Sequence, residues 1–148
     1  MLETKIIEVD GVQYRHTLLD ARKGRTLYYR LIQSLAPTLD KLDLSKDVDP
    51  GLFITRFVAS AIAGLGPELF DSLCDACAES TMVLRPGGED SLSKVFSTHF
   101  AGRYSSLMRW LLETVRANGW LDFLEEIFKA GLSGLASELR QGSESPKT

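Results

Sequence analysis

Between Leu92 and Leu124 the chain carries an almost unbroken series of large apolar side chains at helical spacing. They recur at three- and four-residue steps, which place them on one face of an α-helix. The side chains on this face are Val95, Phe96, Phe100, Tyr104, Leu107, Met108, Leu111, Leu112 and Val115. Because so wide a face carries aromatic rings, other helices must cover it. The spacing therefore predicts one central helix within a helical packing.

Local signals indicate where this helix begins and ends. Ser91 or Ser93 can cap its first turn, because a serine hydroxyl accepts a hydrogen bond from a free backbone amide. Asn118 and Gly119 tolerate the left-handed conformation in which many helices end. A further apolar series after them predicts a last helix over residues 120–139.

Residues 5–16 predict a short β-hairpin. Two alternating runs flank Asp10-Gly11, a pair that suits the type I′ turn of a two-residue loop. In that register four apolar residues share one side of the ribbon, namely Ile7, Val9, Val12 and Tyr14. An isolated hairpin is only marginally stable, so this one must pack on the helices or add to another sheet edge. Addition of a partner's strand is the functional alternative, but docking on the chain's own core is commoner.

Three helical segments are expected before the central helix. A leucine series after Asp20 is interrupted by Pro37, which predicts a kink or two short helices. Asp49-Pro50 predicts the start of the next helix, and Gly66-Pro67 separates it from a third that ends near Thr81. Residues 81–84 are β-prone, and we expect the Pro86-Gly87-Gly88 segment after them to be an exposed loop.

The first of these helices begins with a cluster of positive charges, formed by Arg22, Lys23, Arg25 and Arg30. Such a cluster could bind an acidic partner or a phosphate group. A solvated helix start is the simpler explanation, and no glycine-rich phosphate loop accompanies the cluster.

Together these segments predict a mainly α fold, a compact multi-helix domain with a short N-terminal β-hairpin. A length of 148 residues suits one domain, which we place at residues 1–140, with the hairpin at 5–16 and the helices at 20–139. Residues 141–148, QGSESPKT, are small and polar and predict a disordered tail.

Composition argues against nucleic-acid binding and membrane insertion. A hydrophobic fraction of 44% is that of an ordinary globular protein, and a net charge of −3 argues against a general nucleic-acid binder. The longest apolar runs fall short of the ~20 residues that span a bilayer. The N-terminal residues lack the apolar core of a signal peptide, so we expect a soluble cytoplasmic chain.

The residues best suited to chemistry do not form a catalytic pattern. Cys74 and Cys77 could be a redox pair or half of a zinc site, with His16 and His99 as the remaining soft ligands. Both cysteines share a helix face with Leu69, Phe70 and Leu73, so structural packing is the better explanation. His99 could be a general base, but a hydrogen-bonded structural histidine is commoner. We therefore predict no enzyme, no cofactor and no metal.

The order of these features resembles that of the bacteriophage tail assembly chaperones over residues 5–128. The resemblance lies in the VDGVQYRH hairpin, the LDARKGRTL segment, the LFDSLCDACAESTMVL stretch and, most distinctively, FSTHFAGRYSSLMRWLLETVRANG. It implies a small helical protein of the host bacterial cytoplasm that escorts the tape measure protein during tail assembly. It also implies tail tube subunits as further partners, no catalytic residues, and in many relatives a longer frameshifted form.

Such a role requires an apolar groove that can cover the stripes of a long amphipathic partner. We place this groove between the helix of residues 53–65 and the last helix. Its candidate partner-binding anchors are Phe57, Trp110, Trp120 and Phe128, because large aromatic residues carry disproportionate binding energy. The alternative is that each of them belongs to the core. The leucines of the last helix could also form a contact between two copies of the chain.

Two other classes of function remain open from the sequence. A tail-completion or connector protein would stay in the finished virion, whereas a chaperone would be absent from it. A small inhibitor module would bind a host protein through its acidic surface. We expect neither nucleic acid nor membrane as a partner.

Overall fold

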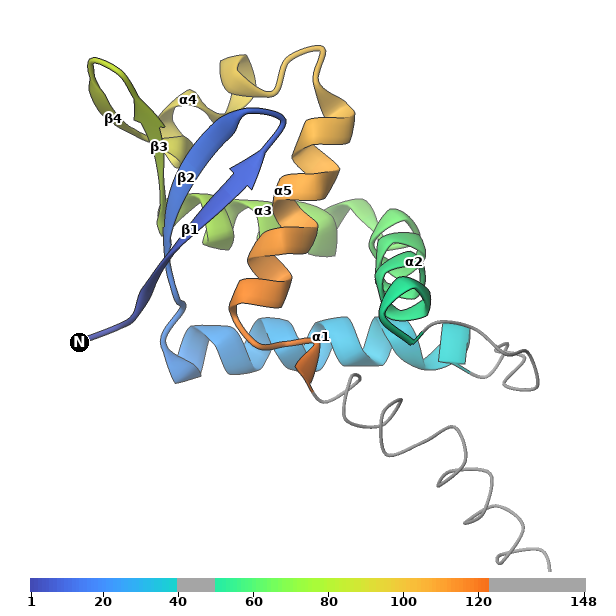
Figure 1. Ribbon diagram of the computed structural model, residues 1–148. Helices are drawn as coiled ribbons and strands as arrows, with labels where there is room; N and C mark the ends of the chain where they lie inside the picture. Colours follow the sequence, from blue (N-terminus) through green and yellow to red (C-terminus); the bar gives the residue numbers. More distant parts are fainter. Residues whose placement is uncertain (40–49, 123–148) are drawn as a thin grey trace, which may run out of the picture.

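The computed structural model describes residues 1–39 and 50–122, with side chains placed for residues 1–34 and 56–122. Strands and helices are interleaved along these residues (Figure 1). In chain order the elements are β1 (Thr4–Val9), β2 (Val12–Thr17), α1 (Ala21–Leu39), α2 (Pro50–Ala63), α3 (Pro67–Glu79), β3 (Thr81–Arg85), β4 (Gly88–Ser91), α4 (Leu92–His99) and α5 (Tyr104–Ala117).

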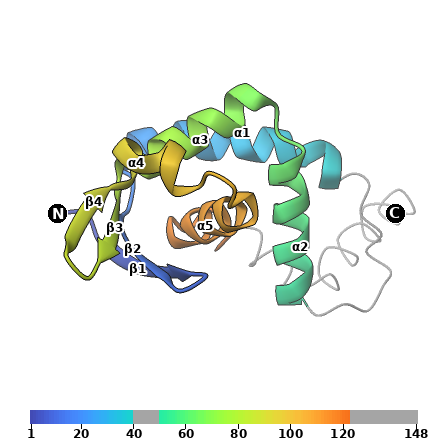
Figure 2. The same ribbon diagram turned by 90° about the horizontal axis from the view of Figure 1, so that it is seen from above.

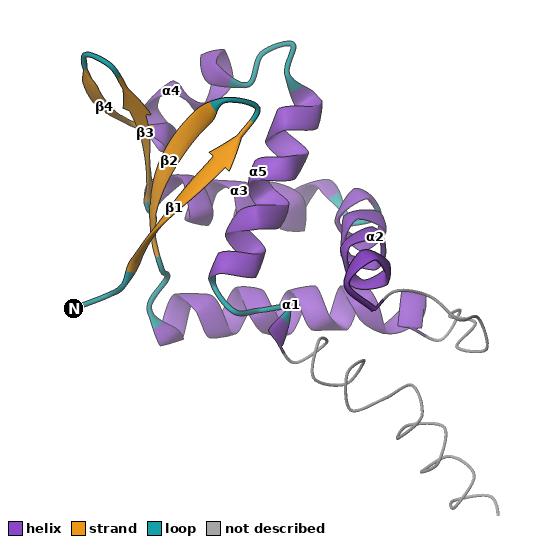
Figure 3. Cartoon of the chain, viewed as in Figure 1, coloured by secondary structure: helices purple, strands orange, loops and turns teal. Residues whose placement is uncertain are grey.

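The strands form one antiparallel sheet in the order β1-β2-β3-β4, and the helices lie on one side of it (Figure 3). The prediction of a mainly α fold with only a short hairpin is therefore wrong. The β-prone residues after α3 pair with β2, and β4 returns through the Pro86-Gly87 turn, which is exposed as expected. β4 was not predicted, because its sequence, GEDS, contains residues that are depleted in strands.

The structure confirms the strand register that was predicted for the N-terminal hairpin. Val9 lies opposite Val12 and Ile7 opposite Tyr14. Asp10 and Gly11 have φ values of 50° and 81°, as a type I′ turn requires. The Asp10 carboxylate also accepts hydrogen bonds from Ser106 and Arg109 of α5. The turn is thus anchored to a helix that follows it by almost a hundred residues.

Helix boundaries follow the predicted signals in three places. α2 begins at Pro50, α3 begins at Pro67, and α5 ends at Ala117 just before Asn118. At the start of α1, the Asp20 carboxylate accepts hydrogen bonds of 3.0 Å from the backbone amides of Arg22 and Lys23. Asp20 is therefore the N-cap of this helix.

One helix prediction fails, and at Pro37 only one of the two predicted alternatives, the division into two short helices, is excluded. The single helix expected from Leu92 is divided into α4 and α5, because the chain turns at Gly102 with a φ of 72°. Phe100, the C-cap of α4 just before the turn, is still buried, so the apolar period continues across the break. α1 runs from Ala21 to Leu39 without dividing at Pro37. The predicted last helix and the tail lie outside the described residues.

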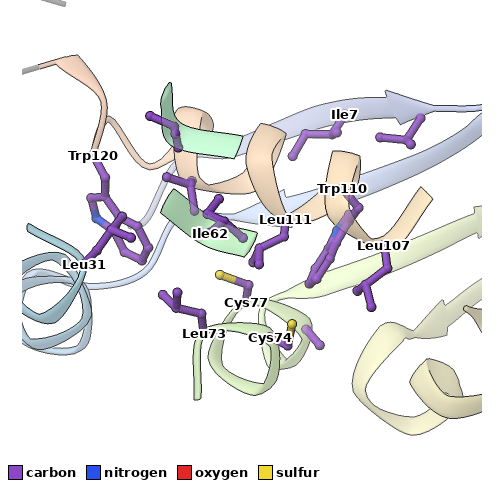
Figure 4. Packing of buried hydrophobic residues seen from close by; sticks show 14 of the residues in the cluster. Ile7, Leu31, Ile62, Leu73, Cys74, Cys77, Leu107, Trp110, Leu111 and Trp120 are labelled. Atoms are coloured by element: carbon purple, nitrogen blue, oxygen red, sulfur yellow. The ribbon is translucent and has the colours of Figure 1, made fainter. Parts of the chain in front are cut away.

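α5 is the centre of the molecule. Viewed along its axis, it is surrounded by the sheet, by α1 and α3, and by α2 (Figure 2). Buried side chains from all of these elements meet around it (Figure 4). They include Ile7 of β1, Leu31 of α1, Ile62 of α2, Leu73 of α3 and Leu111 of α5 itself. The apolar face recognised in the sequence is thus the inner face of the core.

Among the described residues, no single helix combines the length and apolar character needed to cross a membrane. One pair of helical segments, Arg56–Ala63 and Pro67–Glu79, reaches that length and composition only together and is bent by 116° at its break.

Candidate functional site

The predicted partner-binding anchors that the structure describes are buried. Phe57 is 5% exposed, Trp110 is 0% exposed and Trp120 is 7% exposed. Phe128 lies outside the described residues, as does the last helix that would form the second wall of the predicted groove. A partner-binding role for these residues stays a prediction, and in this conformation the three described ones pack in the core.

The two tryptophans occupy different parts of that core. Trp110 belongs to an aromatic cluster in which its ring centroid lies 6.1 Å from that of Phe96 and 5.6 Å from that of Phe100. Its indole Nε1 is buried and has no hydrogen-bond partner among the described residues. Trp120 packs on α1, where its Nε1 would lie 3.7 Å from a Cβ atom built on Gly24. The two rings therefore do not form a common anchor.

A buried polar network joins the sheet to α5 and was not foreseen in the sequence. His16 Nδ1 lies 2.8 Å from the hydroxyl of Thr81, and that hydroxyl donates to the carbonyl of Cys77. On the other side of the ring, His16 Nε2 lies 3.0 Å from Asn118 Nδ2. The Asn118 side chain also accepts from the backbone amide of Leu19. One network thus holds together β2, β3 and the end of α5.

The hydrogen-bond directions assign the protonation state of His16. Thr81 uses its proton toward Cys77, so it accepts from Nδ1–H, and the unprotonated Nε2 accepts from Asn118. Burial lowers the pKa of His16 to about 4, although the Asn118 contact acts in the opposite direction. At neutral pH the ring is therefore uncharged, and both of its nitrogens are used by the protein itself.

The second histidine, His99, also contacts another side chain of the fold. His99 Nε2 lies 2.7 Å from the hydroxyl of Tyr14, which is buried in the sheet. Burial lowers the pKa of His99, with smaller contributions from the positive charges of Arg103 and Arg85. The contact with Tyr14 confirms the expectation of a hydrogen-bonded histidine.

Cys74 and Cys77 are both buried on α3, which confirms their predicted packing role. Burial raises the pKa of each thiol to about 12, and nearby Asp71 and Asp75 add to this effect at Cys74. The thiols are therefore protonated at neutral pH and are poor nucleophiles. The described part of the chain contains no group of three or more His, Cys, Asp or Glu side chains arranged to hold a metal ion.

The outer face of α1 is the most distinctive exposed surface. Tyr29 is 63% exposed, and Arg25 and Arg30 lie on either side of it along the helix. A surface hollow of about 410 Å³ is lined by Arg25, Thr26, Tyr29, Arg30 and Gln33. We call Arg22, Arg25, Tyr29, Arg30 and Gln33 the α1 stripe. Its charges belong to the cluster recognised in the sequence, but the exposure of Tyr29 was not predicted.

A second hollow of about 340 Å³ adjoins the α1 stripe at Arg25. Its walls include Tyr28 of α1 and the segment from Asn118 to Trp120 that follows α5. The edge of Trp120 therefore reaches the surface here, although most of the ring is covered.

The outer edge of β1 is a further exposed feature. Ile6 is 59% exposed, and a hollow of about 320 Å³ lies between β1 and α5, with Glu113 and Arg116 on its helical side. β2 uses its second edge to pair with β3, so the hairpin joins a sheet within its own chain. Among the described strands, β1 pairs only with β2.

Comparison with known proteins gives one result. A family model described as "Phage tail assembly chaperone protein, TAC" matches residues 10–133, which include every described helix and three of the four strands in full. No curated protein and no solved structure matches the chain.

Proposed function

This chain belongs to the phage tail assembly chaperone family, and we propose that it binds the tape measure protein and keeps it soluble while the tail tube assembles. The family match over residues 10–133 is the observation that carries this proposal. We further propose that it acts in the cytoplasm of the host bacterium, without catalysis, and that tail tube subunits are a second partner.

Physical considerations support the proposal. A tape measure protein is a long amphipathic helical chain, and its apolar stripes self-associate until the tube encloses them. A chaperone for such a chain needs a closed core of its own and an exposed surface for the partner. The described core is closed around α5, whereas the α1 stripe presents the exposed ring of Tyr29 and three exposed arginines. Many copies bound along one partner would supply avidity from individually modest contacts.

Co-expression tests the proposal directly. The tape measure protein of the same phage is produced alone and together with the chaperone, and its soluble fraction is measured. We expect the partner to be mostly insoluble alone and to appear in a soluble complex when the chaperone is present.

Two outcomes would overturn the proposal. Unchanged precipitation of the tape measure protein would show that the chain does not escort it. Mass spectrometry of purified particles supplies the second criterion, because stoichiometric amounts of the chain in finished virions would favour a structural tail component.

A further inference from the structure

We propose that the α1 stripe is the docking surface for a negatively charged helical segment of the tape measure protein, an inference that rests on the proposed function. The proposal starts from the charge on this helix. Between Ala21 and Ser34 there are four positive residues and no negative one, although the whole chain has a net charge of −3. This stretch of α1 is thus locally basic within a chain that is acidic as a whole.

The arginines of the α1 stripe differ from most of the arginines on the other described elements, although Arg56 and Arg103 also form no ion pair with a described carboxylate. Four other arginines each form an ion pair with a carboxylate, and these are Arg15, Arg85, Arg109 and Arg116. Arg22, Arg25 and Arg30 form no ion pair with any carboxylate in the described part of the chain. Asp20 also attracts Arg22 electrostatically. These guanidinium groups are available to an external carboxylate.

The position of these charges is unfavourable for the helix itself. The N-terminal end of a helix carries partial positive charge and favours acidic residues. α1 has no acidic residue in its first turn. The N-cap carboxylate of Asp20 attracts Arg22 and Lys23, and Arg25 lies further along the helix. Arg25 has no ion pair with a carboxylate of the described residues, and a local preference broken in this way is expected at functional sites.

Tyr29 and the hollow beside it supply the apolar part of the surface. The ring is 63% exposed between Arg25 and Arg30, and the hollow of about 410 Å³ is lined by residues of α1 alone. An aliphatic side chain of a partner helix can rest on the tyrosine ring while flanking carboxylates reach the two guanidinium groups. Tyrosine and arginine are the residues most often found at the energetic centre of interfaces.

The geometry favours an acidic helix over a nucleic acid. Arg22 and Arg30 are eight residues apart, or about 12 Å along the helix axis, which matches carboxylates two turns apart on a partner helix. Base stacking would need several interleaved aromatic rings, and the α1 stripe contains only Tyr29. The net negative charge of the chain would also repel a phosphate backbone at longer range.

Reversal of charge on the α1 stripe tests the inference. Arg25→Glu/Arg30→Glu and Tyr29→Ala are each co-expressed with the affinity-tagged tape measure protein, and the chaperone retained on the partner is quantified at increasing salt. Arg56→Glu/Lys94→Glu is the matched control, because it changes the net charge equally at exposed positions on α2 and α4. Circular dichroism and thermal melting verify that each variant folds.

We expect the α1 double variant to be retained at least about tenfold less than wild type, with a smaller loss for Tyr29→Ala and none for the control. Wild-type retention should fall as salt rises, because the contacts are between charges.

Equal retention of wild type and Arg25→Glu/Arg30→Glu would overturn the inference while leaving the proposed function intact. Loss of the wild-type complex on nuclease treatment would identify a nucleic acid as the ligand instead. If wild type itself binds no tape measure protein, both proposals fail.

Discussion

At the residue scale, His16 shows how the fold controls a titratable group. The ring is fully buried, Nδ1 donates to Thr81, and Nε2 accepts from Asn118. Protonation of Nε2 would place its new proton against the amide hydrogens of Asn118, and burial would leave the positive charge without solvation. The folded state therefore holds His16 neutral, whereas the unfolded chain binds a proton near the ordinary pKa.

This difference predicts that stability falls in mild acid. Between pH 6.5 and about 4 the unfolded state binds more protons at His16 than the folded state, so the free energy of unfolding decreases as the pH falls. The stability that comes from keeping His16 neutral is fully present above pH 6.5. About 2 kcal/mol of this stability should be lost by pH 5. Urea denaturation at pH 7.5 and pH 5 measures the loss.

Two measurements distinguish the effect of His16 on the pH dependence of stability from the effects of other titratable groups. His99→Gln should keep most of the pH dependence, because it removes only the second, half-buried histidine. The pKa values of Asp10 and Asp20 are lowered from 3.8, so their titration lies below the window used here. A histidine NMR titration that placed the pKa of His16 near 6.5 would contradict the prediction.

At the element scale, the turn between α4 and α5 gives the central region its shape. Phe100 is buried just before the turn, and Gly102 has a φ of 72°, a conformation that side chains with a Cβ atom rarely adopt. A Cβ atom on Gly102 would have no neighbour within 4 Å. Any cost of substitution here therefore comes from the backbone and not from a clash.

We predict that Gly102→Ala destabilises the protein by about 1 kcal/mol, the approximate cost of a left-handed alanine. Gly102→Asn should cost less, because asparagine tolerates this conformation better than alanine does. The midpoints of urea denaturation at neutral pH measure both effects.

Gly87→Ala is the control for this prediction. Gly87 also has open space around its Cα, but its φ does not lie in the positive region. We expect this variant to be close to wild type in stability. Equal losses for Gly87→Ala and Gly102→Ala would contradict the backbone explanation.

At the scale of the whole molecule, the core forms around α5, and the large aromatic residues are buried in this core. Trp110 on α5 is fully enclosed and contacts the Phe96 and Phe100 rings, while Phe57 and Trp120 are covered by other elements. A loss of partner binding on substitution of these residues is informative only if stability is measured on the same variant.

We predict that Trp110→Ala lowers the free energy of unfolding by about 3–5 kcal/mol, since it leaves a large cavity beside α5. Trp110→Phe should cost much less, because the indole Nε1 has no hydrogen-bond partner to lose in the part of the chain that the structure describes. Thermal melting and denaturant titration of both variants measure the difference.

The same variants address the partner-binding prediction. If Trp110→Phe keeps the melting temperature of wild type and still fails to retain the tape measure protein, an anchor role for Trp110 is supported. If Trp110→Phe were as destabilising as Trp110→Ala, the indole nitrogen would have to make a contact that the structure lacks.

Much of this protein was readable from local sequence. Asp10-Gly11 determined the hairpin and its register, Pro67 the start of α3, and the apolar spacing of α5 its buried face. The family resemblance, confirmed by the match over residues 10–133, also came from the sequence. These features depend on neighbouring residues, through turn preferences, helix caps and periodicity, so the chain encodes them within short segments.

Tertiary structure alone decided the rest. β4 is a polar segment that becomes a strand only because β3 lies beside it, and the His16 network joins residues about a hundred positions apart. The burial of Trp110 and the exposure of Tyr29 likewise depend on which elements cover each helix face. An aromatic residue at helical spacing has the same local pattern in either place, and only contacts with distant elements determine whether it belongs to the core or to the surface.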